Sequence, residues 1–217
     1  AARSFLVAAL AVDVRAPLLW IVARPDQVTS VVDQLRQWLP DPDRVLAFAE
    51  PPSLPYERIP WSADTVRERL NALSALSTWR EGDEAPPVVV TSARALIQRT
   101  LPKREYNLGL RTLRVGQRLR LTRLLATWMD LGYEATSVVE EPGTFSRRGG
   151  ILDMYSAHTR HPVRIELFGD EVDSLRVFDP ATQRSDDVTH VRLDHIVIPP
   201  ARELLPGDAA SLGVRLQ

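Results

Sequence analysis

Histidine is the residue type in this sequence best suited to bind a metal ion or to move protons near neutral pH. The four histidines are His158, His161, His190 and His195. His158 and His161 are spaced so that a helix could present both to one metal ion, but they lie in the turn-like stretch Ser156–Pro162. The chain has no cysteine, and no carboxylate has a convincing ligand spacing. We therefore interpret them as histidines of surface loops and expect no metal site.

Acidic residues are the next candidates, because two carboxylates can act as general acid and general base. Five of them lie close together in the sequence: Asp153, Glu166, Asp170, Glu171 and Asp173. Strand alternation and a tight hairpin turn at Gly169-Asp170 direct most of them toward solvent. Ser146 lacks suitable neighbours for a nucleophile, and the absence of cysteine excludes a catalytic thiol. The sequence therefore predicts a chain without catalytic residues.

A nucleotide site would need glycines, because the backbone of a phosphate-binding loop must approach the phosphates closely. The first glycine of the chain is Gly82, and the patterns G-x-x-x-x-G-K-[ST] and G-x-G-x-x-G do not occur. We therefore expect no nucleotide or other cofactor to bind through these residues. A phosphate loop upstream of Ala1 stays open as an alternative, since the missing initiator Met suggests a fragment.

The composition argues against several other classes of protein. The 217 residues carry a formal net charge of −1, and 44% of them are hydrophobic, which is typical of a globular chain. Basic and acidic residues balance in both halves, so the charges do not indicate a broad nucleic-acid surface. No apolar run is long enough to span a membrane, and cysteine is absent. We expect a cytoplasmic protein with no membrane contact.

The first half of the chain alternates predicted helices and strands. Continuous apolar runs predict strands buried on both faces, as at Leu18–Ala23 and Pro87–Thr91. Phe5–Val12 is compatible with a buried helix. The remaining elements are a helix with an apolar stripe from Val28 to Leu39, a strand at Arg44–Phe48, a helix capped by Ser62 and a short helix at Ala93–Gln98. Such alternation implies parallel strands joined by crossover helices.

The second half has a different pattern. An amphipathic helix is predicted at Arg118–Leu131, and short strands separated by turn signals follow it. The predicted strands are Thr136–Glu140, Gly143–Tyr155, Val163–Phe168, Glu171–Phe178 and Leu193–Ile198. The predicted fold class is therefore α/β, with a parallel-sheet domain followed by a smaller, β-rich α+β domain.

One segment, Phe145–Gly150, combines residue types that dominate protein–protein contacts. Aromatic residues and arginines are enriched at binding hot spots, and the two glycines let a strand bend or bulge. Strict alternation gives one face with Phe145, Arg147, Ile151 and Tyr155, and another with Arg148, Leu152 and Met154. A bulge would change that register, so the faces stay unassigned. The alternative to a binding segment is an edge strand kept soluble by its charges.

A longer stretch resembles a known family. Residues Glu141–Ser185, EPGTFSRRGGILDMYSAHTRHPVRIELFGDEVDSLRVFDPATQRS, are similar to the second domain shared by the excision-repair protein UvrB and bacterial transcription-repair coupling factors. They follow the pattern G-x-F-x-x-R-G-x-x-x-D-[IVLM]-[FY], then R-[IVL]-[ED]-[FL]-F-G-D-E-[IV], almost throughout. Val115-Gly116-Gln117 resembles the opening of that domain, and Leu54-Pro55-Tyr56 resembles the first domain of the coupling factors. The resemblance thus extends over nearly the whole chain.

The resemblance implies three parts: a degenerate RecA-like domain at residues 1–106, a UvrA-interaction domain at 107–198 and the start of a return to the first domain at 199–217. In UvrB a phosphate loop ends in Gly-Lys-Thr, where this chain has Ala2, Arg3 and Ser4, as in a lost nucleotide site. UvrB also carries a long tyrosine-rich hairpin, where this chain has only Glu50–Pro60. These departures favour a coupling factor, and a fragment of UvrB is the alternative.

The resemblance also implies a function, namely a non-catalytic module that recruits UvrA to stalled transcription for nucleotide excision repair. Arg148 matches the arginine before glycine that the families use to bind UvrA, and Tyr155 lies at an aromatic position of that surface. Arg147 and Phe145 are neighbouring candidates. A further contact arginine of the families is replaced by Glu134, which reverses the charge there.

The remaining expectations concern the longer parent protein. The resemblance implies an ATP-driven DNA translocase downstream, with ATP and Mg²⁺ bound there. RNA polymerase and double-stranded DNA would bind through other regions of the parent. The resemblance further implies that the parent's C-terminal domain masks the UvrA-binding surface at times. A purely structural role, in which the second domain packs against the parent and hides its arginines, is therefore a third possibility.

Overall fold

The computed structural model describes residues 2–52, 61–83, 85–185 and 192–203. The chain divides into two units, Ala1–Thr100 and Leu101–Gln217. The sequence puts this division after residue 106 instead. The structure assigns the helix α5 (Lys103–Gly109) to the second unit, where Gly109 lies against Pro200 with no room for a Cβ atom. Residues 199–203 also stay on the second unit, since the Ala201 amide donates to the carbonyl of Leu131 over 2.9 Å.

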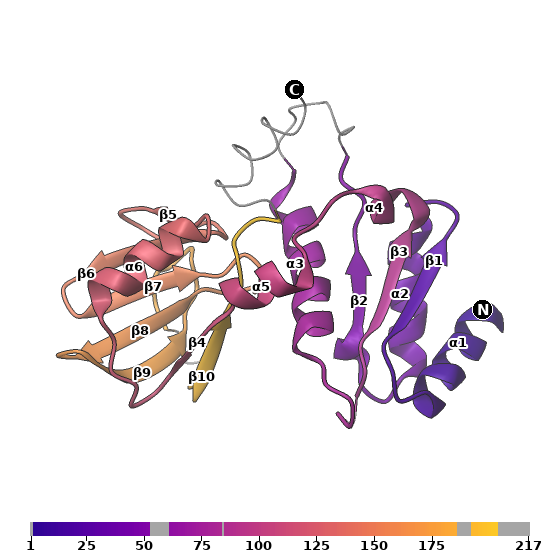
Figure 1. Cartoon of the computed structure of the whole chain (residues 1–217), viewed down its shortest axis with the longest axis horizontal. Coiled ribbons are helices and arrows are strands. Elements are labelled where there is room, and N and C mark those ends of the chain that lie inside the picture. Colours follow the sequence, from indigo (N-terminus) through magenta and orange to yellow (C-terminus); the bar gives the residue numbers. More distant parts are fainter. Residues whose placement is uncertain (1, 53–60, 84, 186–191, 204–217) are drawn as a thin grey trace. The chain divides into compact units, whose positions relative to one another are not determined.

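The first unit is built on a three-stranded parallel sheet of order β1-β3-β2 (Figure 1). The strands are β1 (Leu18–Val22), β2 (Val45–Phe48) and β3 (Val88–Ser92), and the helices are α1 (Ala2–Asp13), α2 (Gln27–Trp38), α3 (Ala63–Thr78) and α4 (Ala93–Ile97), with a 3₁₀ turn at Pro42–Arg44. Apolar residues of α1 and α2 form a core with the sheet, and residues of α3 and α4 form a second one. The predicted parallel sheet with crossover helices is confirmed.

Two burial predictions for the first unit are wrong. The helix α1 buries only Ser4, Ala8 and Ala11, while Phe5, Leu6, Leu10 and Val12 are at least half exposed. The strand β1 is not buried on both faces, because it is an edge strand and α3 packs against β2, which leaves Leu19 and Ile21 exposed. No helix among the described residues is both long and apolar enough to cross a membrane.

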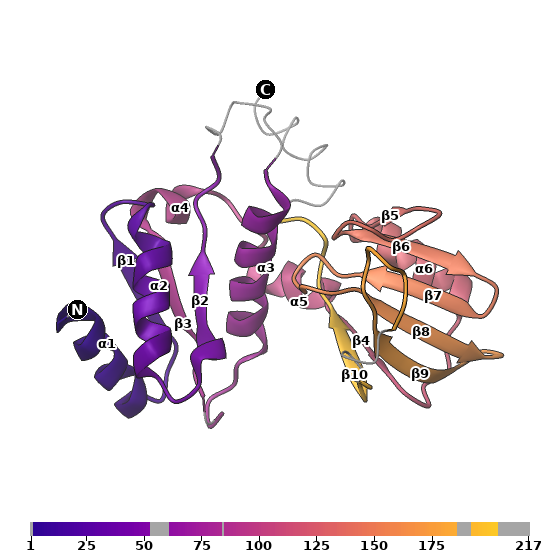
Figure 2. The same ribbon diagram turned by 180° about the vertical axis from the view of Figure 1, so that it is seen from behind.

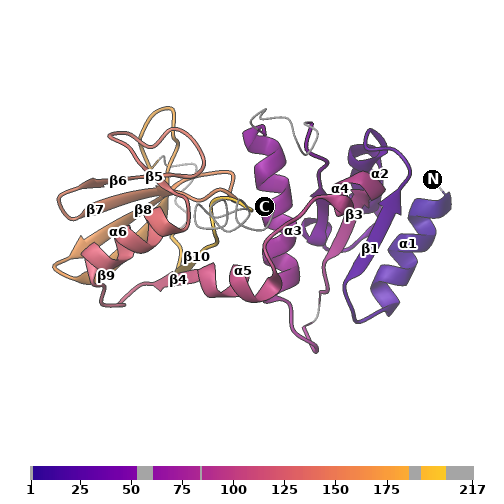
Figure 3. The same ribbon diagram turned by 45° about the horizontal axis from the view of Figure 1, so that its top comes forward.

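The second unit contains a five-stranded sheet of order β5-β6-β7-β8-β9. Its strands are β5 (Glu134–Ala135), β6 (Thr144–Arg148), β7 (Ile151–Tyr155), β8 (Val163–Phe168) and β9 (Glu171–Val177). All neighbours are antiparallel except β5 and β6, and a separate antiparallel pair joins β4 (Arg111–Arg114) to β10 (His195–Ile198). The helix α6 (Leu121–Asp130) lies against one face of the large sheet (Figure 3), where Trp128 is buried against Phe145 with ring centroids 5.3 Å apart. The predicted β-rich second half is confirmed.

Several predicted elements of the second unit differ from the observed ones. The predicted strand Gly143–Tyr155 is a hairpin, because Gly149 adopts a φ of +61° and the chain reverses at Gly149-Gly150. The predicted strand Thr136–Glu140 is not a strand, and its residue Val139 is instead buried against Tyr155 and Phe178. The helix α6 begins at Leu121 rather than Arg118. The elements α5 and β4 were not predicted.

Candidate partner-binding surface

The register of the β6–β7 hairpin shows on which side of the sheet each residue of Phe145–Tyr155 lies, which strand alternation alone left open. Residues that pair across two strands point to the same side of the sheet, and Arg148 pairs with Ile151 while Ser146 pairs with Asp153. These four residues define one face, which we call the arginine face. The opposite face is covered by α6 and is called the helix face; it carries Phe145, Arg147, Leu152 and Met154. The two neighbouring arginines therefore point to opposite sides of the sheet.

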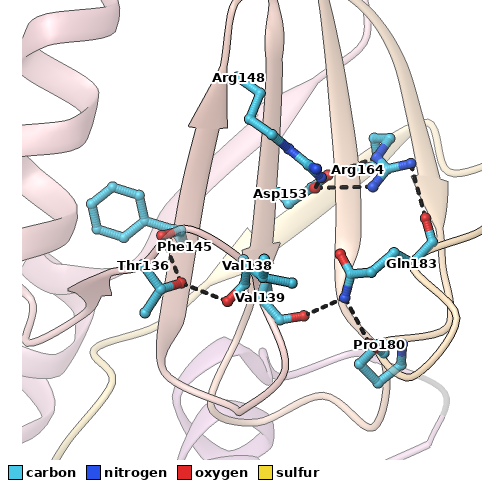
Figure 4. Close-up of polar contacts among 9 residues, drawn as sticks. All are labelled: Thr136, Val138, Val139, Phe145, Arg148, Asp153, Arg164, Pro180 and Gln183. Atoms are coloured by element: carbon cyan, nitrogen blue, oxygen red, sulfur yellow. Dashed lines mark hydrogen bonds and ion pairs between the residues drawn. The ribbon is translucent and has the colours of Figure 1, made fainter.

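A buried carboxylate organises the arginine face. Asp153 has 0% exposed side-chain surface and accepts hydrogen bonds from two arginines (Figure 4). The Nη2 atom of Arg148 lies 2.7 Å from its Oδ2, and the Nε and Nη2 atoms of Arg164 lie 2.7 and 2.9 Å from Oδ1 and Oδ2. The hydrogen bonds to Asp153 raise the pKa of Arg164 above its ordinary value. Since two guanidinium groups share one carboxylate, the trio keeps a net positive charge.

The chain after β9 and the segment that contains Val139 lie on the arginine face and are linked to Arg164 through Gln183. Figure 2 shows the chain after β9 crossing in front of β7 and β8. Arg164 donates from Nη1 to the carbonyl of Gln183 over 3.3 Å and lies 4.7 Å from the centre of the Phe178 ring. The Gln183 side chain donates in turn to the carbonyls of Val139 and Pro180 (Figure 4). Arg148, with 52% of its side chain exposed, lies at the end of the face next to the hairpin turn.

The two aromatic candidates are buried. Phe145 packs under α6, and Tyr155 lies against Val139 and Phe178. The Tyr155 hydroxyl donates to the carbonyl of Arg160 over 2.7 Å. Both side chains therefore contribute to the packing of the unit.

Glu134, the residue that departs from the family pattern, lies on the arginine face. It pairs in β5 with Thr144 of β6, which places its side chain on the same side as Arg148. Its carboxylate forms an exposed ion pair with Arg202. Because Arg202 neutralises this carboxylate, the reversed charge at Glu134 is compensated locally. Arg147 does not provide that compensation, since it lies on the helix face.

The residues at the degenerate loop positions belong to the first turn of α1. Ala2 and Arg3 are exposed, whereas Ser4 is buried and its hydroxyl donates to the Oε1 atom of Gln34 in α2 over 2.7 Å. The Ser4 hydroxyl thus joins two helices of the first unit.

The interpretation of the histidines as surface-loop residues holds only in part for His158, which lies in a turn but is partly buried. Its Nδ1 atom lies 2.7 Å from the Ser156 hydroxyl, and burial lowers its pKa to about 4. It lines a cleft of about 320 Å³ with the exposed His161 and His195. His190 lies outside the described residues. Within the described part of the chain, no three His, Cys, Asp or Glu side chains are grouped as metal ligands.

Ser156, the partner of His158, also contacts a buried tyrosine, Tyr133. The hydroxyl of Tyr133 contacts the Ser156 hydroxyl over 3.1 Å and donates to the carbonyl of Pro199 over 2.9 Å, and burial raises its pKa to about 12. These bonds hold the turn after β7 against the chain that follows β10. The sequence predicts the turn, but no local signal reveals its contact with the residues that follow β10.

The fold and this surface define a class of protein: a two-unit α/β protein whose β-rich unit carries a half-exposed arginine next to a hairpin turn. Residues 112–204 match the family described as the UvrB interaction domain. The chain is 34% identical to the transcription-repair-coupling factor of Myxococcus xanthus, over 96% of the chain and 17% of that relative. The corresponding proteins of Bacillus subtilis and Escherichia coli are 35% and 30% identical over 94% and 98% of the chain, and over 16% and 17% of their own lengths.

The chain is thus similar over nearly its whole length to transcription-repair-coupling factors, and residues 112–204 match the UvrB interaction domain, which confirms the resemblance seen in the sequence. It spans about a sixth of the length of the curated relatives it matches.

Proposed function

We propose that this chain is a non-catalytic module that binds UvrA and thereby serves transcription-coupled nucleotide excision repair. The observation that carries the proposal is the exposed guanidinium of Arg148, held by the buried Asp153 within the part that matches the UvrB interaction domain. Arginine is a frequent binding hot spot, because its planar group forms paired hydrogen bonds with a carboxylate. Since Asp153 already fixes the side chain, less rotational freedom is lost when a partner binds.

The proposal extends to the longer protein of which this chain would be a part. There the module brings UvrA to stalled transcription. An ATP-driven translocase, which binds ATP and Mg²⁺, lies in another region of that protein. Other regions also bind RNA polymerase and double-stranded DNA. The degenerate RecA-like character of the first unit is part of the same proposal. It is supported by the parallel sheet and by the glycine-free start of the chain. The similarity to coupling factors over nearly the whole chain favours this origin over a fragment of UvrB.

Replacing Arg148 tests the proposal directly. We expect Arg148→Ala to weaken UvrA binding by about 30-fold, the effect of a typical hot spot. Isothermal titration of the chain with UvrA measures the dissociation constant. Arg123→Ala is the matched control, because Arg123 is an exposed arginine of α6, which lies on the helix face. An unchanged affinity of the Arg148 variant would remove the site, and a wild-type chain that does not bind UvrA would remove the partner.

The same titration distinguishes a free from a masked surface. If the C-terminal domain of the longer protein covers Arg148, then the full-length protein binds UvrA more weakly than this chain does. Equal affinities would exclude masking. Absence of binding by both would favour the structural role, in which the second unit packs within the parent protein.

A further inference from the structure

Two hairpin turns lie side by side at one end of the large sheet of the second unit. The first joins β6 to β7 at Gly149-Gly150, and the second joins β8 to β9 at Gly169-Asp170 (Figure 1). The amide of Leu167 donates to the carbonyl of Gly150 over 2.8 Å. A Cβ atom on Gly150 would lie only 3.1 Å from the Leu167 carbonyl oxygen, so the close approach of the two turns favours glycine. The two turns therefore form one continuous edge.

Alternation along β8 determines where its last residue points, because the irregularity in the pairing of β8 and β9 lies in β9. Glu166 pairs with Ser174, but the next residue, Leu167, pairs with Val172, so that Asp173 is an extra residue in β9. Val172 is buried, and its partner Leu167 points to the same side. By alternation, the residue after Leu167 points to the side of Glu166.

Phe168 consequently lies on the arginine face. Glu166 pairs with Ile151, and Ile151 pairs with Arg148, so all of these residues share one side of the sheet. Phe168 has 84% of its surface exposed, the largest fraction among the large hydrophobic side chains in the described residues. Ile151 is 36% exposed. An exposed aromatic ring on the same face as an apolar side chain and an arginine is the composition of a binding hot spot.

We propose that Phe168 is the apolar anchor of the docking surface that also contains Arg148, with Ile151 between them. The inference rests on the proposed function, because the occupant is the same partner, UvrA. The chemistry of the three side chains requires a partner surface that has an apolar recess for the phenyl ring beside a carboxylate for the guanidinium. A carboxylate on the partner would be complementary in charge to this surface, since the trio of Arg148, Asp153 and Arg164 keeps a positive charge.

A second copy of this chain fits the surface less well. In a two-fold symmetric contact centred on Ile151, the positively charged trio of one copy would face the same trio of the other copy. Like charges brought together and removed from water repel each other, which disfavours that contact. The charge pattern therefore favours a different protein with acidic groups.

The test compares Phe168→Ala with the wild-type chain in a titration with UvrA. We expect the dissociation constant to rise by roughly tenfold or more, as for truncation of an aromatic hot spot. The melting temperature should stay unchanged, because the side chain is exposed. Met129→Ala is the matched control: Met129 is half exposed on α6, on the helix side of the sheet, and its truncation should leave the affinity unchanged.

The possible results separate this inference from the proposed function. If Arg148→Ala weakens binding but Phe168→Ala does not, UvrA docks without Phe168 and the inference fails alone. If the wild-type chain does not bind UvrA, the proposed function fails and the inference fails with it. If Phe168→Ala abolishes a dimer seen in sedimentation but leaves UvrA affinity unchanged, the occupant is a second copy and the inference is overturned.

Discussion

Asp153→Ala should lower the unfolding free energy of the second unit by about 3–5 kcal/mol, the loss expected when one partner of a buried ion pair is removed. The carboxylate is fully buried, and its removal leaves the largely buried side chain of Arg164 without its two hydrogen bonds to that carboxylate. Arg148 loses the same anchor. Amide hydrogen exchange in β7 and β8 measures the change, because it reports the opening free energy of this unit separately from the first.

The control for Asp153→Ala is an acidic residue whose ion pair is exposed. Glu171 lies 3.6 Å from Arg118, and both side chains are well exposed. Glu171→Ala should therefore change the unfolding free energy by less than about 1 kcal/mol. Equal effects of the two substitutions would contradict the organising role of Asp153.

Asp153 should also affect partner binding, but only through Arg148. The milder Asp153→Asn removes the negative charge and keeps the shape of the side chain, so it is the better variant for a titration with UvrA. If Asp153 positions Arg148, this substitution weakens binding in the wild-type chain and has little further effect in the Arg148→Ala variant. Additive losses would show that Asp153 acts on the partner surface by another route.

Part of this network was accessible from the sequence. The motif around Arg148 led to the resemblance that the match of residues 112–204 to the UvrB interaction domain confirms, and apolar runs such as the one at Val88–Ser92 predicted the parallel sheet correctly. The sequence predicts that most of the five clustered acidic residues point toward solvent, and it gives no sign that Asp153 is the buried one. Its burial depends on Arg164, which lies on the neighbouring strand and pairs with it across the sheet. Periodicity within one strand cannot reveal such a pairing.

The turn at Gly149-Gly150 shows a second limit of sequence patterns. Two glycines are compatible with a bulge as well as with a hairpin turn, and the choice reverses the faces of all residues that follow. Alternation also does not indicate the extra residue Asp173 in β9, which shifts the pairing of β9 but leaves Phe168 on the side of Glu166. The arginine face therefore emerged only from the register of the strands.

Acidification should destabilise the second unit through His158. Its pKa is lowered from 6.5 to about 4 by burial, so the folded state favours the neutral ring while the unfolded state binds a proton more readily. The contribution of the neutral ring is complete above pH 6.5 and is lost as the pH falls from 6.5 toward 4. The difference corresponds to about 3 kcal/mol of unfolding free energy at the acidic end. Urea denaturation followed by circular dichroism, at pH values across this interval, measures it.

Replacing the histidine separates its effect from the titration of carboxylates. His158→Gln cannot gain a proton, so its unfolding free energy should change much less than that of the wild type between pH 6.5 and pH 4.5. His161→Gln is the matched control, because His161 lies in the same turn but is exposed, and it should keep the wild-type slope. A slope that survives in the His158 variant would assign the acid sensitivity to other groups. A slope lost only there would assign the acid sensitivity of the second unit to the protonation of His158.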